Sequence, residues 1–123
     1  MKIALIGCGA FGYALAVLIG KTHEHPIVAY DRDENVRRTL RAEHKHPYFH
    51  THVACPRRLT VVDAAENAVS DASIVIVAVP AQHARAAVLE FRDALPRDAV
   101  LLHTSKALER GTNLRLSQAI HEA

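Results

Sequence analysis

A glycine-rich hexapeptide near the N-terminus carries the most specific chemical signal of the chain. Residues 7–12 read Gly-Cys-Gly-Ala-Phe-Gly, follow an apolar run and lead into a helical pattern, and Asp31 lies nineteen positions beyond Gly12. Glycines at this spacing permit a tight turn close to a pyrophosphate, and an acidic residue about twenty positions later can bind ribose hydroxyls. The pattern predicts a dinucleotide-binding turn.

Each glycine of the turn has its own expected role. Gly7 permits the sharp turn out of the first strand, Gly9 lets the backbone approach a pyrophosphate, and Gly12 allows close packing of helix against sheet. The helix N-terminus would present free N–H groups and the positive end of its dipole to the phosphates. A ligand-free glycine turn between core elements is the alternative. We expect Cys8 to be a small side chain below the cofactor, without a catalytic role.

Two neighbouring residues give opposite indications about the cofactor. Asp31 is placed to bind the adenosine ribose hydroxyls, which favours NAD, whereas Arg32 could pair with a 2′-phosphate, which favours NADP. A solvated turn and helix cap over Asp31–Asp33 is the alternative interpretation. The choice between NAD and NADP stays open at this point.

Further candidate residues follow two later strands. Val79 and Pro80 end an apolar strand whose carboxyl end should face the ligand crevice, so their backbone would line the nicotinamide side. Lys106 follows the fifth strand and would reach the same edge, although a solvated loop lysine is equally compatible with the sequence.

Histidines do not form a recognisable metal site. Four of them fall within residues 44–52, but their i, i+2 spacing suits no zinc motif, and we expect no metal to be bound. His83 and His103 are isolated, and we expect both to be hydrogen-bonded residues near the sheet edge.

The elements that must position these residues alternate along the chain. Strands are predicted at Lys2–Ile6, Ile27–Asp31, Leu59–Val62, Ser73–Val79 and Ala99–His103. Helices are predicted at Ala10–Lys21, Glu34–Glu43, Asp63–Val69, Gln82–Ala94 and Asn113–His121. Mostly continuous apolar strands indicate burial on both faces. The order predicts an α/β fold: a Rossmann-type parallel sheet with helices on both faces, formed as a single domain over residues 1–123.

Local signals mark several boundaries. Asp33 and Asp63 are the expected N-caps of the second and third helices. Residues 44–58 lack a regular pattern and should form a loop on the rim of the sheet. Cys8 and Cys55 are the only cysteines, and both are expected to be free thiols.

The composition limits the classes of partner. The chain has 50% apolar and 23% charged residues and a formal charge of +2, with its basic residues dispersed. This balance is typical of a soluble globular protein and does not favour nucleic acid as a partner. No leader or membrane-spanning run is evident, so a cytoplasmic location without membrane association is expected.

Several motifs together resemble the NAD(P)-dependent glycerol-3-phosphate dehydrogenases. Residues 7–16 are similar to the opening of that family, whose turn has a large aromatic residue before the third glycine. The arginine-containing turn at Asp31–Asp33, the strand that ends at Pro80 and the segment Ser105–Thr112 are also similar to parts of the family. Its Tyr-Leu-Pro-Gly loop is altered to Tyr48–Thr51, and its Lys-Gly pair reads Lys-Ala in this chain.

The resemblance implies reduction of dihydroxyacetone phosphate to sn-glycerol 3-phosphate with NAD or NADP. It implies that Ala10, Phe11, Arg32 and Tyr48 contact the dinucleotide, and that Lys106 reaches both nicotinamide and substrate. The family's general acid/base belongs to a helical C-terminal domain that has no counterpart in these 123 residues. We therefore expect no catalytic residue in this chain, little or no turnover alone, and either a homodimer or a separate C-terminal half as partner.

Two other functions remain open. A stand-alone dinucleotide-binding module would bind cofactor without catalysis. The first domain of another two-domain enzyme, such as a ketopantoate reductase, would share the glycine turn and the strand that ends in Val-Pro. The segment Ser105–Glu109 argues against this last alternative.

Overall fold

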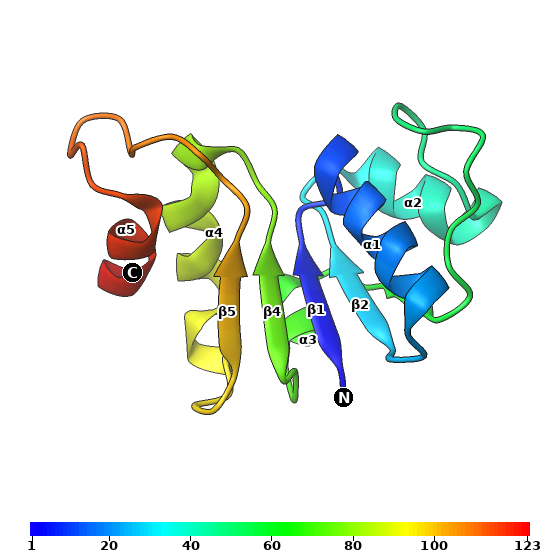
Figure 1. The fold of residues 1–123 in the computed structure, drawn as a ribbon, viewed down its shortest axis with the longest axis horizontal. Helices are drawn as coiled ribbons and strands as arrows, with labels where there is room; N and C mark the ends of the chain where they lie inside the picture. The colour runs from blue at the N-terminus through cyan, green and yellow to red at the C-terminus, as the bar shows by residue number, and fades with distance from the viewer.

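A five-stranded parallel sheet forms the centre of the computed structural model, which describes residues 1–123 (Figure 1). Its strands are β1 (Ile3–Ile6), β2 (Ile27–Tyr30), β3 (Leu59–Val61), β4 (Ile74–Val77) and β5 (Val100–His103). They lie in the order β3-β2-β1-β4-β5, and every neighbouring pair is parallel. The chain order reverses at β1, so a crevice is expected where β1 and β4 end.

Helices cover both faces of this sheet (Figure 1). They are α1 (Ala10–Thr22), α2 (Glu34–Glu43), α3 (Ala65–Val69), α4 (Ala84–Phe91) and α5 (Leu116–Glu122). Short 3₁₀ turns, η1 (Ala81–His83) and η2 (Arg92–Ala94), flank α4, so the helix predicted at Gln82–Ala94 is three consecutive pieces. The predicted Rossmann-type fold is confirmed.

Two apolar clusters hold the helices against the sheet. One packs Leu5 of β1 against Tyr13 and Leu40, and the other packs Ile6 against Val69 and Phe91. Neighbouring residues of a strand point to opposite faces, so β1 contributes to both clusters. All four of its residues are buried, as a strand covered on both faces requires.

The edge strand β5 departs from the predicted burial. Val100 and Leu102 expose 55% and 48% of their surface, whereas Leu101 packs against the cluster that contains Phe91. The helices α1 and α2 lie over the other half of the sheet, and no helix lies over β5 on that face (Figure 1). Burial on both faces was therefore wrong for this strand.

One of the two predicted N-caps is confirmed. Asp33 caps α2, because its carboxylate accepts a hydrogen bond from the Asn35 N–H at 2.9 Å. Asp63 is not a cap, since Ala64 occupies that position in α3. Its carboxylate instead pairs with the guanidinium groups of Arg37 and Arg41, at 3.2 and 2.8 Å.

Residues 44–58 form the predicted rim loop, with one antiparallel bridge between Lys45 and Ala54. The loop is tied to α1 by the Tyr13 hydroxyl, which donates to the Val53 carbonyl oxygen at 2.6 Å. The fully buried Tyr13 thus connects the rim to the core.

Candidate functional site

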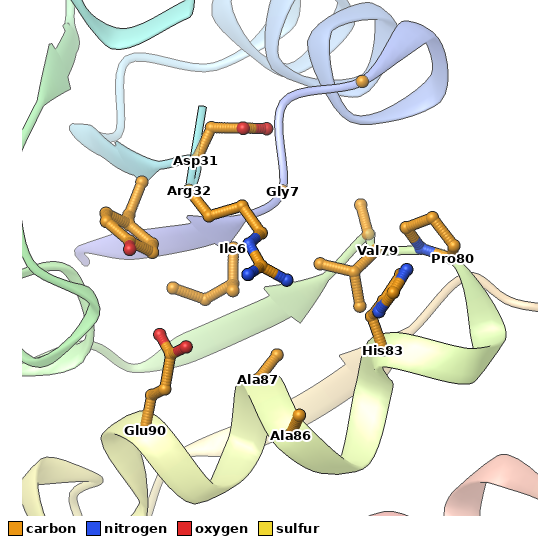
Figure 2. Close-up of a pocket in the computed structure, with 13 residues that line it drawn as sticks. Ile6, Gly7, Asp31, Arg32, Val79, Pro80, His83, Ala86, Ala87 and Glu90 are labelled. Atoms are coloured by element: carbon orange, nitrogen blue, oxygen red, sulfur yellow. The ribbon is translucent and has the colours of Figure 1, made fainter. Parts of the chain in front are cut away.

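A cavity of about 270 Å³ opens at the carboxyl ends of β1, β2 and β4 (Figure 2). Its thirteen lining residues include six of those predicted from sequence, namely Gly7, Gly9, Asp31, Arg32, Val79 and Pro80. These six come from three separate turns of the chain. The fold therefore brings the predicted residues to the point where the strand order reverses.

Another wall of the cavity consists of residues from η1 and α4. The sequence analysis predicted this helical segment but did not assign its residues to the site. His83, Ala86, Ala87 and Glu90 face the cavity from this side (Figure 2). Their numbers differ by three, one and three, which is the spacing of one helical face. That periodicity, combined with the position of the helix after the strand that ends at Pro80, was the signal available in the sequence.

The glycine turn is constrained by its backbone surroundings. Gly7 has a φ of +96°, and a Cβ atom there would lie 2.6 Å from the carbonyl oxygen of Ala78. A Cβ atom on Gly12 would collide with the Gly7 carbonyl oxygen. Gly9 differs, because a Cβ atom there would meet no atom within 4 Å. Gly7 and Gly12 therefore maintain the turn, while the space beside Gly9 is open to a ligand.

The N-terminus of α1 suits an anionic group. Gly9 is its N-cap and supplies no capping side chain, and the first turn contains no acidic residue. The first N–H groups of an α-helix have no partner within the helix and attract anions. In α2, by contrast, the Asp33 carboxylate already accepts a hydrogen bond from one of these N–H groups. The cavity residues thus fit a dinucleotide whose pyrophosphate lies at the start of α1.

Asp31 connects the glycine turn to the end of β2. One carboxylate oxygen accepts from the Cys8 N–H at 2.7 Å, and the other accepts from the Asp33 N–H at 2.9 Å. A carboxylate has about four lone-pair positions, so two remain for ribose hydroxyls. Asp31 therefore has a structural role that does not prevent ligand binding.

Arg32 extends across the cavity, with Glu90 of α4 on the opposite wall (Figure 2). Its guanidinium takes part in none of the ion pairs of the structure. An unpaired arginine fork is well matched to a phosphate group. Binding of a 2′-phosphate by Arg32 stays a prediction.

Five predicted site residues lie outside the cavity lining, and one of them is the buried Gly12 of the glycine turn. Ala10 and Phe11 are exposed in the first turn of α1, directly after Gly9. Tyr48 lies on the rim loop, where its hydroxyl accepts from the Asn35 side chain at 2.9 Å. Lys106 is exposed in the segment after β5. The cofactor and substrate contacts of these residues stay predictions.

His46 anchors the glycine turn and was missed by the sequence analysis. Its Nδ1 accepts hydrogen bonds from the N–H groups of Tyr48 and Phe49, at 3.0 and 3.1 Å. The proton must then be on Nε2, which donates to the Cys8 carbonyl oxygen at 2.6 Å. The buried ring is therefore a fully bonded neutral imidazole that connects the rim loop to the turn.

The two isolated histidines differ from expectation. His83 is exposed and lines the cavity, and its ring forms no hydrogen bond in the structure. The Nδ1 atom of His103 is buried without a hydrogen-bond partner. The prediction of a hydrogen-bonded ring was wrong for His103, whose Nδ1 is buried at the end of β5. His83 lies in η1 and is exposed at the cavity, so its ring is open to solvent.

The cysteine in the turn is chemically passive. Cys8 is 1% exposed. Burial, followed by the negative charge of Asp31, raises the pKa of its thiol far above the usual range. Burial also raises the pKa of Cys55, to about 11. Both residues are free thiols, as predicted.

The fold and this site define the class: a Rossmann-type dinucleotide-binding domain. A sequence model of the NAD-dependent glycerol-3-phosphate dehydrogenase N-terminus matches residues 2–123. The chain belongs to this family and corresponds to its N-terminal, NAD-binding part. This result supports the resemblance over the ketopantoate reductase alternative.

Individual relatives agree with this assignment. The chain is 34% identical over 122 residues to the glycerol-3-phosphate dehydrogenase [NAD(P)+] of Corynebacterium diphtheriae, with 99% of the chain and 37% of the relative covered. It is 31% identical to the enzyme of the same name from Clostridium perfringens, with 98% and 36% covered. The crystal structure of glycerol-3-phosphate dehydrogenase from Coxiella burnetii shares the fold, with a TM-score of 0.90 at 15% identity and 98% and 37% covered. The chain thus spans little more than a third of these proteins.

Proposed function

We propose that this chain is the cofactor-binding part of an NAD(P)-dependent glycerol-3-phosphate dehydrogenase, which interconverts dihydroxyacetone phosphate and sn-glycerol 3-phosphate. The observation that carries the proposal is the cavity at the strand-order reversal, where the glycine turn, Asp31, Arg32 and the residues after β4 meet. Ligands of open α/β sheets bind at this position.

Each part of the cavity has a role in this proposal. The start of α1 binds the pyrophosphate through free N–H groups. Asp31 and Arg32 contact the adenosine ribose and its substituent, and Val79 and Pro80 line the nicotinamide side. A bound nicotinamide supplies or accepts the hydride. The Lys106 ammonium stabilises negative charge on the substrate carbonyl oxygen, which a preorganised cation does well away from water.

We propose that residues 1–123 form one dinucleotide-binding domain and that a helical C-terminal domain supplies the proton donor and most of the substrate pocket. Hydride transfer requires both parts to enclose and orient the reactants. The chain alone would bind the cofactor and turn over poorly.

The cellular setting proposed here is the cytoplasm, where the product would serve phospholipid precursor metabolism. The ligands are a dinucleotide and a triose or glycerol phosphate, without nucleic acid or membrane as partner. None of the helices has the length and apolar character needed to cross a bilayer. The macromolecular partner is either a second copy of the chain or the C-terminal half.

Fluorescence titration of the 123-residue chain with NADH and with NADPH tests the binding proposal. We expect saturable binding of at least one cofactor and its loss in Gly9→Val, because a branched side chain would occupy the open space beside the turn. Circular dichroism checks that this variant is folded. Unchanged affinity in Gly9→Val, or no binding by the unaltered chain, would contradict the proposal.

The same titration addresses cofactor preference. Loss of the Arg32 guanidinium in Arg32→Ala should weaken NADPH binding about tenfold, equivalent to about 1.4 kcal/mol, with a smaller effect on NADH. An equal loss for both cofactors would place Arg32 away from the 2′-phosphate. A second assay mixes the chain with a C-terminal half of the family and measures dehydrogenase activity. Activity would indicate part of an enzyme, and its absence would favour a stand-alone binding module.

A further inference from the structure

The segment that carries Lys106 has no regular secondary structure of its own. It runs from residue 104 to residue 115, between β5 and α5, and its residues 106–108 are all exposed. Internal backbone hydrogen bonds join Glu109 to Leu114 and Asn113 to Glu109. Such a segment is mobile unless side chains fix it to the folded domain.

An ion pair fixes the middle of this segment. Arg85 of α4 donates from Nε and Nη2 to the two carboxylate oxygens of Glu109, both at 2.9 Å. The Glu109 side chain is only 12% exposed, and one of its oxygens also accepts from the Thr112 hydroxyl at 2.7 Å. A two-point arginine–carboxylate pair restricts orientation as well as distance.

Gln82 of η1 holds the residues on either side of Glu109. Its Nε2 donates to the Leu108 carbonyl oxygen at 3.2 Å, and its Oε1 accepts from the Arg110 N–H at 2.8 Å. Nearer to β5, the Ser105 hydroxyl donates to the Val79 carbonyl oxygen at 2.9 Å. Lys106 is therefore held between anchors at Ser105 and at residues 108–110.

Two of these anchors belong to the helical segment that also forms the cavity wall. Gln82 and Arg85 are three residues apart and hold the segment, whereas Ala86 and Glu90 face the cavity (Figure 2). The contacts of Arg85 and Gln82 thus connect the segment of Lys106 to the wall of the cofactor cavity.

We propose that Arg85 and Gln82 are positioning residues, which hold the backbone of residues 108–110 so that Lys106 reaches the bound dinucleotide and substrate. This inference rests on the proposed function of the cavity. Neither residue needs to contact a ligand for this role.

A purely structural role for Arg85 makes a different prediction. Its Nη2 also donates to a carboxylate oxygen of Glu122 at 2.8 Å, which joins α4 to α5. If Arg85 only stabilised the position of α5, then loss of the Glu122 charge would disturb Lys106 as much as loss of the Glu109 charge. Glu122→Gln is therefore the matched control, because it leaves the pair with Glu109 in place.

The test measures acetylation of lysines by N-hydroxysuccinimidyl acetate, with and without saturating NADPH, followed by peptide mass spectrometry. The exposed Lys21 at the end of α1 is the internal reference. In the unaltered chain we expect NADPH to slow acetylation of Lys106 about fivefold or more relative to Lys21, because a lysine in contact with ligand is protected.

The variants then separate the two roles. In Arg85→Ala we expect protection of Lys106 to fall below about twofold while the NADPH dissociation constant changes less than about threefold, and in Glu122→Gln we expect full protection. Arg85→Lys, which retains the charge without the planar fork, should be intermediate. Gln82→Ala should also lose protection and provides a second test if Arg85→Ala is unfolded.

Two results would overturn the inference while NADPH still binds. One is full protection of Lys106 in both Arg85→Ala and Gln82→Ala, and the other is a loss of protection in Glu122→Gln equal to that in Arg85→Ala. A lack of protection in the unaltered chain would remove the assigned role of Lys106, and the inference with it. If the unaltered chain binds neither NADH nor NADPH, the proposed function itself fails, and that failure is seen in the titration rather than in the variants. If it binds NADH alone, NADH replaces NADPH in this test.

Discussion

The two sides of the candidate site are held in place by different means. On the β1–α1 side, backbone atoms leave no room for a side chain at Gly7 or Gly12. On the side of Lys106, the chain is held by the side chains of Gln82, Arg85 and Ser105. Steric contact fixes the conformation of the first side, whereas ion pairs and hydrogen bonds near solvent fix the conformation of the second.

This difference determines how each side should respond to change. Backbone contacts cannot be weakened gradually, so a single methyl group should be costly there. Partly exposed ion pairs contribute little to global stability and depend on pH. We therefore expect large stability effects in the glycine turn and mainly local effects near Lys106.

The largest expected effect comes from a pair of substitutions within the turn. Gly12→Ala should lower the free energy of unfolding by about 3 kcal/mol or more, because the new Cβ atom collides with the Gly7 carbonyl oxygen. Gly9→Ala should cost less than about 1 kcal/mol, since it changes only the N-cap preference. Urea denaturation monitored by circular dichroism measures both values. Equal losses would show that the turn is not limited by this contact.

A smaller effect is expected where the turn depends on a side chain. Asp31→Ala should cost about 2 kcal/mol, because the Cys8 and Asp33 N–H groups lose their acceptor. Asp31→Asn keeps one side-chain acceptor and should retain part of that stability. The same denaturation experiment applies, and an Asp31→Ala variant as stable as the unaltered chain would contradict this role.

The link between the turn side and the rim loop should be weaker still. Tyr13→Phe removes the hydroxyl that donates to the Val53 carbonyl oxygen and should cost about 1 kcal/mol. Hydrogen exchange of residues 50–55 should increase more than that of β1. If the exchange of β1 rises equally, the hydroxyl supports the whole domain rather than the loop.

The smallest global effect is expected on the Lys106 side, where pH acts locally. Hydrogen bonds from Arg85, and then from Thr112, lower the pKa of Glu109 from 4.5 to about 2. Since the folded-state pKa is the lower one, the stabilisation is complete above pH 4.5 and is lost as the pH falls toward about 2. Hydrogen exchange of residues 107–111, corrected for intrinsic rates, should rise as the pH is lowered through this range.

Glu109→Gln is the control for this last prediction. The amide does not titrate, so exchange in residues 107–111 should be faster than in the unaltered chain at pH 6 and nearly independent of pH after the same correction. A similar pH dependence in both chains would mean that another group controls the segment.

Local sequence signals were sufficient for the turn side of the site. The order of strand, glycine turn and helix and the cap at Asp33 are local patterns in the chain, so the sequence predicted the turn and this cap. The same reasoning failed for Asp63, because its partners Arg37 and Arg41 come from another helix. Burial of β5 was also predicted wrongly, since strand composition does not reveal which face a helix covers.

The contacts near Lys106 and below the turn could not be predicted for the same physical reason. Arg85 and Glu109 are 24 residues apart, and His46 and Cys8 are 38 residues apart. Charged or polar residues at such separations have no periodicity that identifies their partners. Only the folded backbone brings them together.

The sealed position of Cys8 has a consequence for oxidative damage. A buried thiol whose pKa is raised contains almost no thiolate at neutral pH, and thiolate is the form that peroxide oxidises. Oxidation of Cys8 therefore requires the turn to open first. The rate of Cys8 oxidation by hydrogen peroxide would then measure how often the turn opens. A dinucleotide that closes over the turn would slow this reaction and so protect the sulfur beneath it.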